Sequence, residues 1–154
     1  MKKRRVLELE PVGIIHSPYK NAGEAPRQNR DSREISQIEV FEEFAAGLQD
    51  IEGFSHIVVI YWFHESQGYE LLVKPPGEDN LHGLFATRSP HRPCPLGLTV
   101  VALVAREKNI LTVKGLDAID GTPVLDIKPY LPGVDERPSV KVGWLEGKLG
   151  RRSN

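Results

Sequence analysis

Short runs of β-branched and aromatic residues, separated by turn residues, recur along the chain and restrict its fold more than any other feature. Such runs are typical of strands, because these side chains pack well on a pleated surface. They predict strands at residues 12–16, 35–40, 56–64, 98–106, 110–114 and 124–130. Tight turns are predicted at Lys108 with Asn109 and at Asp120 with Gly121. The pattern favours a mostly β domain, a small barrel or closed sheet, over an alternating β-α-β fold.

One helix interrupts the predicted strands. An apolar stripe with the helical spacing i, i+3, i+4 and i+7 is formed by Phe41, Phe44, Ala45 and Leu48. The run at residues 56–64 is apolar on both faces, so this strand is expected to be covered on both sides. Shorter strands are expected at residues 84–86 and 140–145, and residues 67–80 are expected to form a long loop.

Length and composition indicate one soluble globular domain of 154 residues. No apolar run approaches the ~20 residues that span a bilayer. Glu8 and Glu10 follow the basic start of the chain, where a signal peptide would need an apolar segment. We therefore expect a cytoplasmic protein without a membrane partner. The single cysteine, Cys94, excludes an internal disulfide and a zinc site built on a cysteine pair.

Charge and histidine spacing narrow the possible ligands. The net charge of −1 does not by itself suggest a nucleic-acid-binding protein, although it can conceal a local basic patch. Basic residues gather at residues 2–5, 27–33, 88–92 and 148–152, each cluster being either a binding patch or a solvated turn. His56 and His64 would lie about 26 Å apart on one strand, too far to share an ion, so no metal site is expected. The chain has no Gly-x-Gly, and therefore lacks the Rossmann phosphate fingerprint.

The proline-rich segment at residues 83–98 is the strongest candidate for a binding loop. Pro90, Pro93 and Pro95 restrict the backbone, so the loop is expected to be stiff. Arg88 and Arg92 could then bind an anion with little loss of conformational entropy. The alternative is a rigid connection with solvated arginines.

Three other polar groups are candidates for the site. His64 and Glu65 follow a buried strand, where a binding site or a simple strand exit is possible. Asp120 is explained by the turn before Gly121, whereas Asp117 has no such explanation and could accept hydrogen bonds from a ligand. The third group, weak when taken alone, consists of Pro26, Arg27 and Gln28.

Taken together, these clusters resemble the TsaA-like family, whose characterised members are tRNA (adenine-N6)-methyltransferases of the TrmO type. The resemblance lies in residues 12–20, 26–28, 53–63, 83–97 and 116–132, in the same order. It implies that residues 1–154 form one domain, a single-sheeted small β-barrel with one or two short helices. The barrel core would span about residues 10–132, with a short C-terminal extension after it.

The family resemblance also implies a function. Such proteins use S-adenosyl-L-methionine to methylate N6 of the threonylcarbamoyladenosine that lies immediately 3′ of the tRNA anticodon. The resemblance also implies a homodimer, with cofactor sites near the subunit interface. Two rival functions stay open, namely a non-catalytic RNA- or ligand-binding barrel and a hydrolase that uses Cys94 or a metal.

Site residues follow from the resemblance position by position. The expected cofactor-binding residues are Pro26, Arg27, Gln28, His64, Glu65, Arg88, Leu98, Lys114, Gly115, Leu116 and Asp117. Deprotonating the weakly nucleophilic N6 would help methyl transfer, so a carboxylate base is expected. Asp117 is the first candidate and Glu65 the second. The chain departs from the family pattern at Cys94, where asparagine is usual, and at Glu65, where bacterial members often have glutamine.

Overall fold

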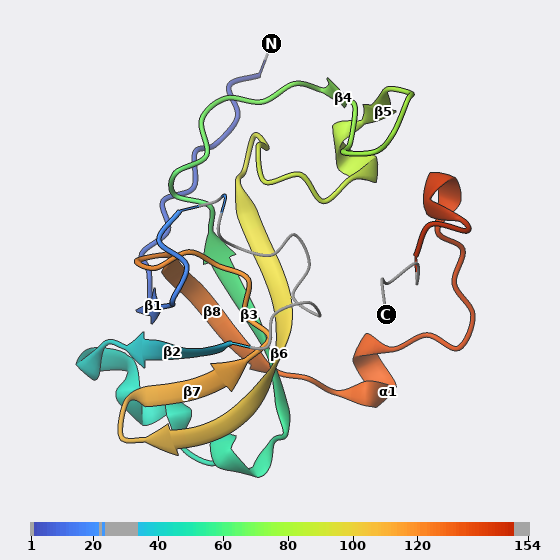
Figure 1. Cartoon of the computed structure of the whole chain (residues 1–154). Helices are drawn as coiled ribbons and strands as arrows, with labels where there is room; N and C mark the ends of the chain where they lie inside the picture. Colours follow the sequence, from blue (N-terminus) through green and yellow to red (C-terminus); the bar gives the residue numbers. More distant parts are fainter. Residues whose placement is uncertain (1, 22, 24–33, 150–154) are drawn as a thin grey trace.

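The computed structural model describes residues 2–21, 23 and 34–149, and it confirms the mostly β fold (Figure 1). Antiparallel strands close into a barrel in the order β1-β2-β7-β6-β3-β8. The strands are β1(Gly13–His16), β2(Ile35–Val40), β3(His56–Trp62), β6(Leu96–Glu107), β7(Ile110–Lys114) and β8(Pro123–Pro129). Each has a hydrogen-bonded neighbour on both sides, so the barrel leaves no open edge.

Alternate residues of the strands fill the barrel. Ile38 of β2, Ile57 and Val59 of β3, and Leu111 and Val113 of β7 are fully buried. Successive side chains of a strand point to opposite faces, so the residues between them lie on the outside. The predicted bounds of β2 and β7 agree with the structure.

The prediction that β3 is covered on both faces is wrong. Ile57, Val59 and Tyr61 are buried, but Val58 and Ile60 are only partly buried. A single closed sheet has one interior, and alternate residues of β3 fill it. The other apolar residues of this strand therefore form part of the outer surface.

Two short predicted strands are 3-10 helices in the structure. Residues 84–86 form η4(Leu84–Ala86), because the hydroxyl and the backbone N–H of Thr87 both donate to the Leu84 carbonyl and close a turn. Residues 140–145 contain η5(Gly143–Leu145), where Gly143 adopts a φ of 56° that a strand does not allow. Neither segment pairs with a strand among the described residues.

The connections differ from the predictions in smaller ways. The helix predicted near Phe44 is η2(Glu42–Leu48), a 3-10 helix of which only Leu48 is buried. The predicted loop at residues 67–80 contains β4(Leu72–Val73), which pairs with β5(His82–Gly83) in a separate small sheet. The remaining short elements are η3(Ile51–Gly53) and α1(Pro132–Asp135). Among the described residues, no helix has the length and apolar character needed to cross a bilayer.

Candidate active site

Several of the predicted site residues lie at one end of the barrel. Here β3 ends, β6 begins, β7 ends and β8 begins, and Tyr61 pairs in register with Gly97 on one side and Val124 on the other. The segments that leave or enter the barrel at this end contain His64, Glu65, Leu98 and residues 114–117. Residues far apart in the sequence therefore share one rim.

Asp117 lies at this rim, shortly after β7, and is held by two hydroxyl groups. Tyr61 Oη donates to Asp117 Oδ1 at 3.1 Å, and Thr99 Oγ1 donates to the same oxygen at 3.3 Å. The two hydroxyl oxygens are themselves 3.2 Å apart. Gly115 makes this placement possible, because its φ of 96° turns the chain directly after β7.

The surroundings of this cluster change its acid–base properties. Partial burial raises the pKa of Asp117, against the opposing effect of the hydrogen bonds from Tyr61 and Thr99. Burial and the negative charge of Asp117 raise the pKa of Tyr61, which keeps this hydroxyl protonated as a donor. The charge of Arg88 lowers the pKa of Tyr61, so Arg88 acts electrostatically on the same cluster. A carboxyl with a raised pKa at a rim is suited to accept a proton.

Sequence reasoning missed Tyr61 and Thr99. Both are buried in the barrel wall, where their positions alone suggested ordinary core residues. The only available signal was a hydroxyl at an inward position near the end of each strand. The pairing of β3 with β6 brings these two residues together, and no local pattern specifies that register.

Gly97 creates the space that the Tyr61 ring occupies. A Cβ atom on Gly97 would lie 2.5 Å from two ring atoms of Tyr61 and 2.9 Å from the Phe63 ring. The Tyr61 and Phe63 rings pack edge to face, with their centroids 5.3 Å apart. The absence of a side chain at Gly97 therefore sets the position of Tyr61 and, through it, of Asp117.

The two arginines of the proline-rich loop have different environments. Arg92 donates through one nitrogen to the Thr87 carbonyl at 2.9 Å and to the Ser89 carbonyl at 3.1 Å. Its guanidinium also lies 5.8 Å from the centroid of the Phe85 ring. Arg88, between those two carbonyls, is exposed and forms no ion pair with a described acidic residue. Arg92 thus organises the loop, and Arg88 is the arginine available to a ligand.

The loop is also tied to the segment that follows β3. Ser66 Oγ lies 2.8 Å from His91 Nδ1 and donates to the Pro90 carbonyl at 3.2 Å. An open cleft of about 430 Å³ lies beside this contact, lined by residues 67–70 together with Val73, Ser89 and His91. Cys94 is exposed on the same loop.

The other predicted site residues are placed as follows. His64 Nε2 lies 4.0 Å from Glu65 Oε1, and the buried His64 Nδ1 has no hydrogen-bond partner among the described residues. Leu98 is 52% exposed on the outside of β6, and Lys114 is exposed. The Leu116 side chain is fully buried in the core, so only its backbone could reach a ligand. The remaining three, Pro26, Arg27 and Gln28, lie outside the described residues.

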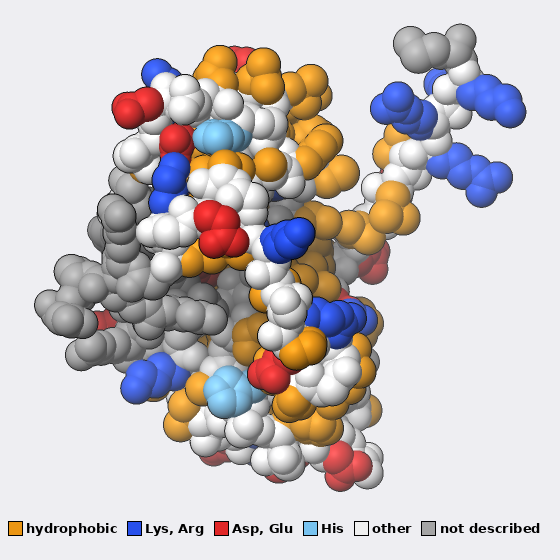
Figure 2. Space-filling view, turned by 90° about the vertical axis from the view of Figure 1, so that its right-hand side faces the viewer, with side chains coloured by type: hydrophobic (Ala, Val, Ile, Leu, Met, Phe, Trp, Pro, Cys, Tyr) orange, Lys and Arg blue, Asp and Glu red, His pale blue; other side chains and the backbone are white. Residues whose placement is uncertain are grey.

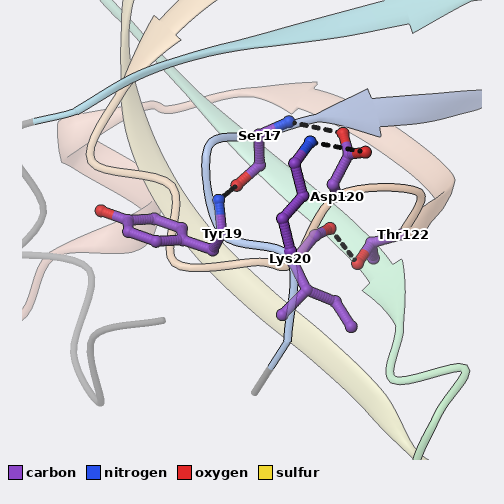
Figure 3. Close-up of polar contacts among 6 residues, drawn as sticks. Ser17, Tyr19, Lys20, Asp120 and Thr122 are labelled. Atoms are coloured by element: carbon purple, nitrogen blue, oxygen red, sulfur yellow. Dashed lines mark hydrogen bonds and ion pairs between the residues drawn. The ribbon is translucent and has the colours of Figure 1, made fainter. Parts of the chain in front are cut away.

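Asp120 differs from Asp117, because it contacts the end of β1 and the residues that follow it; Figure 3 shows these contacts with Ser17 and Lys20. Its Oδ1 accepts from the Ser17 backbone N–H at 2.9 Å, and its Oδ2 pairs with Lys20 Nζ at 3.2 Å. Its own N–H donates to the Tyr19 carbonyl at 2.6 Å. The hydrogen bond from Ser17 and the charge of Lys20 hold the pKa of Asp120 below its usual range. Asp120 therefore fastens the end of β1 to the loop between β7 and β8.

Metal ligands do not gather at this rim. Within residues 2–21, 23 and 34–149, no three His, Cys, Asp or Glu side chains are close enough to hold one ion. Asp117 has hydroxyl partners instead, as described above.

Comparison with known proteins finds a matching family model and several similar proteins. The model of the tRNA-methyltransferase O N-terminal domain matches residues 14–136. An Archaeoglobus fulgidus protein named as a probable S-adenosyl-L-methionine-binding protein is 52% identical over 92% of this chain and 38% of its own length. A second A. fulgidus protein, named S-adenosyl-L-methionine-binding protein, is 49% identical over 91% of this chain and 97% of its own length.

Similarity extends to a named enzyme and to a solved structure. The tRNA (adenine(37)-N6)-methyltransferase of Escherichia coli is 35% identical over 90% of this chain and 64% of its own length. A crystal structure of TrmO from Pseudomonas aeruginosa aligns with a TM-score of 0.77 and 32% identity, over 90% of this chain and 62% of that chain. The chain thus spans less than two thirds of several relatives and nearly all of another.

Proposed function

Because the chain belongs to the tRNA-methyltransferase O N-terminal domain family, as the resemblance implied, we propose that it is an S-adenosyl-L-methionine-dependent tRNA methyltransferase. Its acceptor is N6 of an adenine, by analogy with the E. coli relative. The finer proposal is the threonylcarbamoyladenosine 3′ of the anticodon, and the cytoplasm is the proposed location. The observation that carries the proposal is the Tyr61–Thr99–Asp117 cluster at the rim of the barrel.

The residues at the rim fit such a cofactor. The exposed guanidinium of Arg88 suits a carboxylate, and the exposed Leu98 offers an apolar surface to a flat base. His64 and Glu65 follow β3, at the same end of the barrel as Asp117. S-adenosyl-L-methionine, when bound, supplies an activated methyl group on a sulfonium, so no covalent intermediate with the protein is needed.

The chemical role of the protein is alignment and proton removal. With the cofactor bound, the acceptor N6 would gain its methyl group as the bond from that group to sulfur breaks, and N6 would lose a proton. The proton lost from N6 passes to Asp117, whose raised pKa favours its protonation. Tyr61 and Thr99 fix the carboxylate in position through Oδ1.

The outer face of β3 and β6 supports a homodimer. Trp62 pairs in register with Leu96, and Ile60 pairs with Leu98, on the outside of the barrel. Trp62, Leu96 and Leu98 are 42%, 41% and 52% exposed, respectively. An apolar face of this kind is typical of an association surface. Since Leu98 is also an expected cofactor residue, the cofactor site would lie at the edge of the subunit interface.

Binding of S-adenosyl-L-methionine is expected to stabilise the protein against heat. A ligand that binds only the native state adds about 2.7 kcal/mol at a hundredfold excess over Kd. For a chain of this size that corresponds to an increase in Tm of roughly 5–11 °C. The measurement is a thermal melt with and without millimolar cofactor, paired with titration calorimetry, and adenosine serves as the control ligand.

A methyl-transfer assay on the same purified protein separates the methyltransferase proposal from its strongest rival, the non-catalytic binding module. The archaeal relatives are named only as binding proteins, which favours a non-catalytic module as the second candidate. Transfer of a labelled methyl group to unmodified and threonylcarbamoylated tRNA distinguishes the two. Cofactor binding without transfer to either tRNA would support the binding module, and no cofactor binding at all would exclude the methyltransferase.

Affinity for tRNA is expected to fall steeply with salt, despite the net charge of −1. Lys2, Lys3, Arg4 and Arg5 lie on an extended arm that stands away from the barrel (Figure 2). Replacing all four with glutamine should reduce the log–log salt slope by about 0.7–0.9 for each phosphate contact that is lost. Filter binding at salt concentrations from about 50 to about 300 mM measures that slope.

The other basic residues expected to contact tRNA are only partly covered by the described residues. Arg27, Arg30, Arg33, Arg151 and Arg152 lie outside the described residues. Lys148 pairs with Glu78 and is therefore no free phosphate ligand. An unchanged salt slope in the fourfold arm variant would remove the arm from the footprint.

A further inference from the structure

The segment at residues 142–148 packs on the small β4–β5 sheet through Trp144. The Trp144 indole N–H donates to the Ala86 carbonyl at 2.9 Å. Its ring stacks on His82, with centroids 4.1 Å apart and an interplanar angle of 17°. One side chain thus makes a directed hydrogen bond to η4 and a face-to-face contact with β5.

Lys148 completes the contact from the same segment. Its ammonium pairs with the carboxylate of Glu78 and lies 5.3 Å from the centroid of the Trp144 ring. Glu78 is only 11% exposed in its side chain, and its other oxygen lies 3.8 Å from His82 Nε2. Four side chains from two distant segments therefore form one closed cluster, and such a cluster is stronger than an isolated surface ion pair.

This cluster lies next to the loop that presents Arg88. Ala86 is the last residue of η4 and precedes Arg88 by two positions. Arg92 holds the Thr87 and Ser89 carbonyls, on either side of Arg88. The backbone that leads to Arg88 is thus fixed by Arg92 on one side and by Trp144 on the other.

We propose that residues 142–148 form a clasp that positions Arg88 for the cofactor, with Trp144 as the positioning residue. The inference rests on the proposed function, because it assigns Arg88 to the cofactor site. The clasp lies beyond residues 14–136, the part of the chain that the family model matches.

The test measures the Kd of S-adenosyl-L-methionine for Trp144→Phe, Arg88→Ala and the double variant. Arg88→Ala should weaken binding by roughly 10- to 150-fold, as expected for a lost charge-assisted hydrogen bond. Trp144→Phe keeps a ring against His82 but removes the N–H donor, and should weaken binding by about 3- to 10-fold. If Trp144 acts through Arg88, its effect should disappear in the Arg88→Ala background.

A second measurement follows the clasp without the cofactor. The chain has two tryptophans, so the indole N–H signal that disappears in Trp144→Phe identifies Trp144. That signal should exchange slowly with deuterium in the wild type and faster in Lys148→Ala. Lys141→Ala is the matched control, because Lys141 is exposed and pairs with no described acidic residue.

The possible outcomes separate the inference from the proposed function. Wild-type protein that does not bind the cofactor would overturn the proposed function and the inference with it. If the wild type binds, an unchanged Kd in Trp144→Phe would overturn the inference alone. An equal loss in both backgrounds would also overturn it, because Trp144 would then act independently of Arg88.

Discussion

Asp117→Asn is expected to slow methyl transfer by about 10²- to 10⁴-fold in single turnovers at saturating cofactor. An asparagine oxygen still accepts hydrogen bonds from Tyr61 and Thr99, which hold Asp117 Oδ1 at 3.1 and 3.3 Å. It cannot take up the proton from the acceptor nitrogen. The variant therefore removes the chemistry and leaves the hydrogen-bond geometry largely in place. Rapid-quench measurement of labelled methyl transfer gives the rate.

The thermal stability of the same variant is a second check: turnover should fall, whereas stability should not. Partial burial raises the pKa of Asp117, so the folded protein disfavours the ionised carboxyl. The corresponding stability is fully present below the unfolded-state pKa of about 3.9 and is lost as the pH rises through the folded value. At neutral pH, Asp117→Asn should thus melt at the same temperature as the wild type or higher. A large drop in Tm would instead indicate a structural defect.

Asp120→Asn is the matched control. Its folded pKa is held low by Ser17 and Lys20, so its contribution is present at neutral pH and is lost as the pH falls through that value. Asparagine keeps the acceptor for the Ser17 N–H and loses only the exposed pair with Lys20, so turnover should stay near normal. If Asp117→Asn also turns over normally and binds the cofactor normally, Glu65 becomes the next candidate for the base.

The sequence predicted the strands well wherever local patterning was decisive. The bounds of β2 and β7 were predicted correctly, because alternation and a tight turn at Lys108 and Asn109 define them locally. The turn at Asp120 and Gly121 followed from the same chemistry, and Gly121 indeed has a φ of 84°. Closure of the barrel was expected from strand number and the family resemblance, and it is confirmed.

Elements that depend on specific side-chain contacts could not be predicted in this way. Residues 84–86 have a strand-like composition, but hydrogen bonds from Thr87 close them into a 3-10 turn. Arg92 was expected to bind a ligand, whereas two backbone carbonyls on either side of Arg88 occupy it. The docking of Trp144 against residues more than fifty positions earlier leaves no trace in local periodicity. The first two cases depend on side-chain hydrogen bonds within a few residues, and the docking of Trp144 depends on tertiary structure; neither kind of contact shows in hydrophobic patterning.

Gly97→Ala is expected to reduce both stability and activity, because the new Cβ would lie 2.5 Å from the Tyr61 ring and 2.9 Å from the Phe63 ring. The Tyr61 ring cannot move freely, since Tyr61 is 3% exposed within the barrel. Overpacking of this kind costs about 1–3 kcal/mol, which corresponds to a drop in Tm of roughly 2–12 °C for a chain of this size. Thermal and urea unfolding measure the loss.

Gly47→Ala is the control for this substitution, because a Cβ there meets no atom within 4 Å. It lies in η2, which follows β2 in the chain and contributes none of the candidate site residues, and it should leave both unfolding and turnover near the wild type. In Gly97→Ala, displacement of the Tyr61 ring should also disturb the hydrogen bond to Asp117, so the turnover of the folded fraction should fall. Equal melting temperatures and equal turnover in the two variants would mean that Gly97 does not set the position of Tyr61. Thr99, the other hydroxyl that contacts Asp117, would then be the residue that holds the candidate base in position.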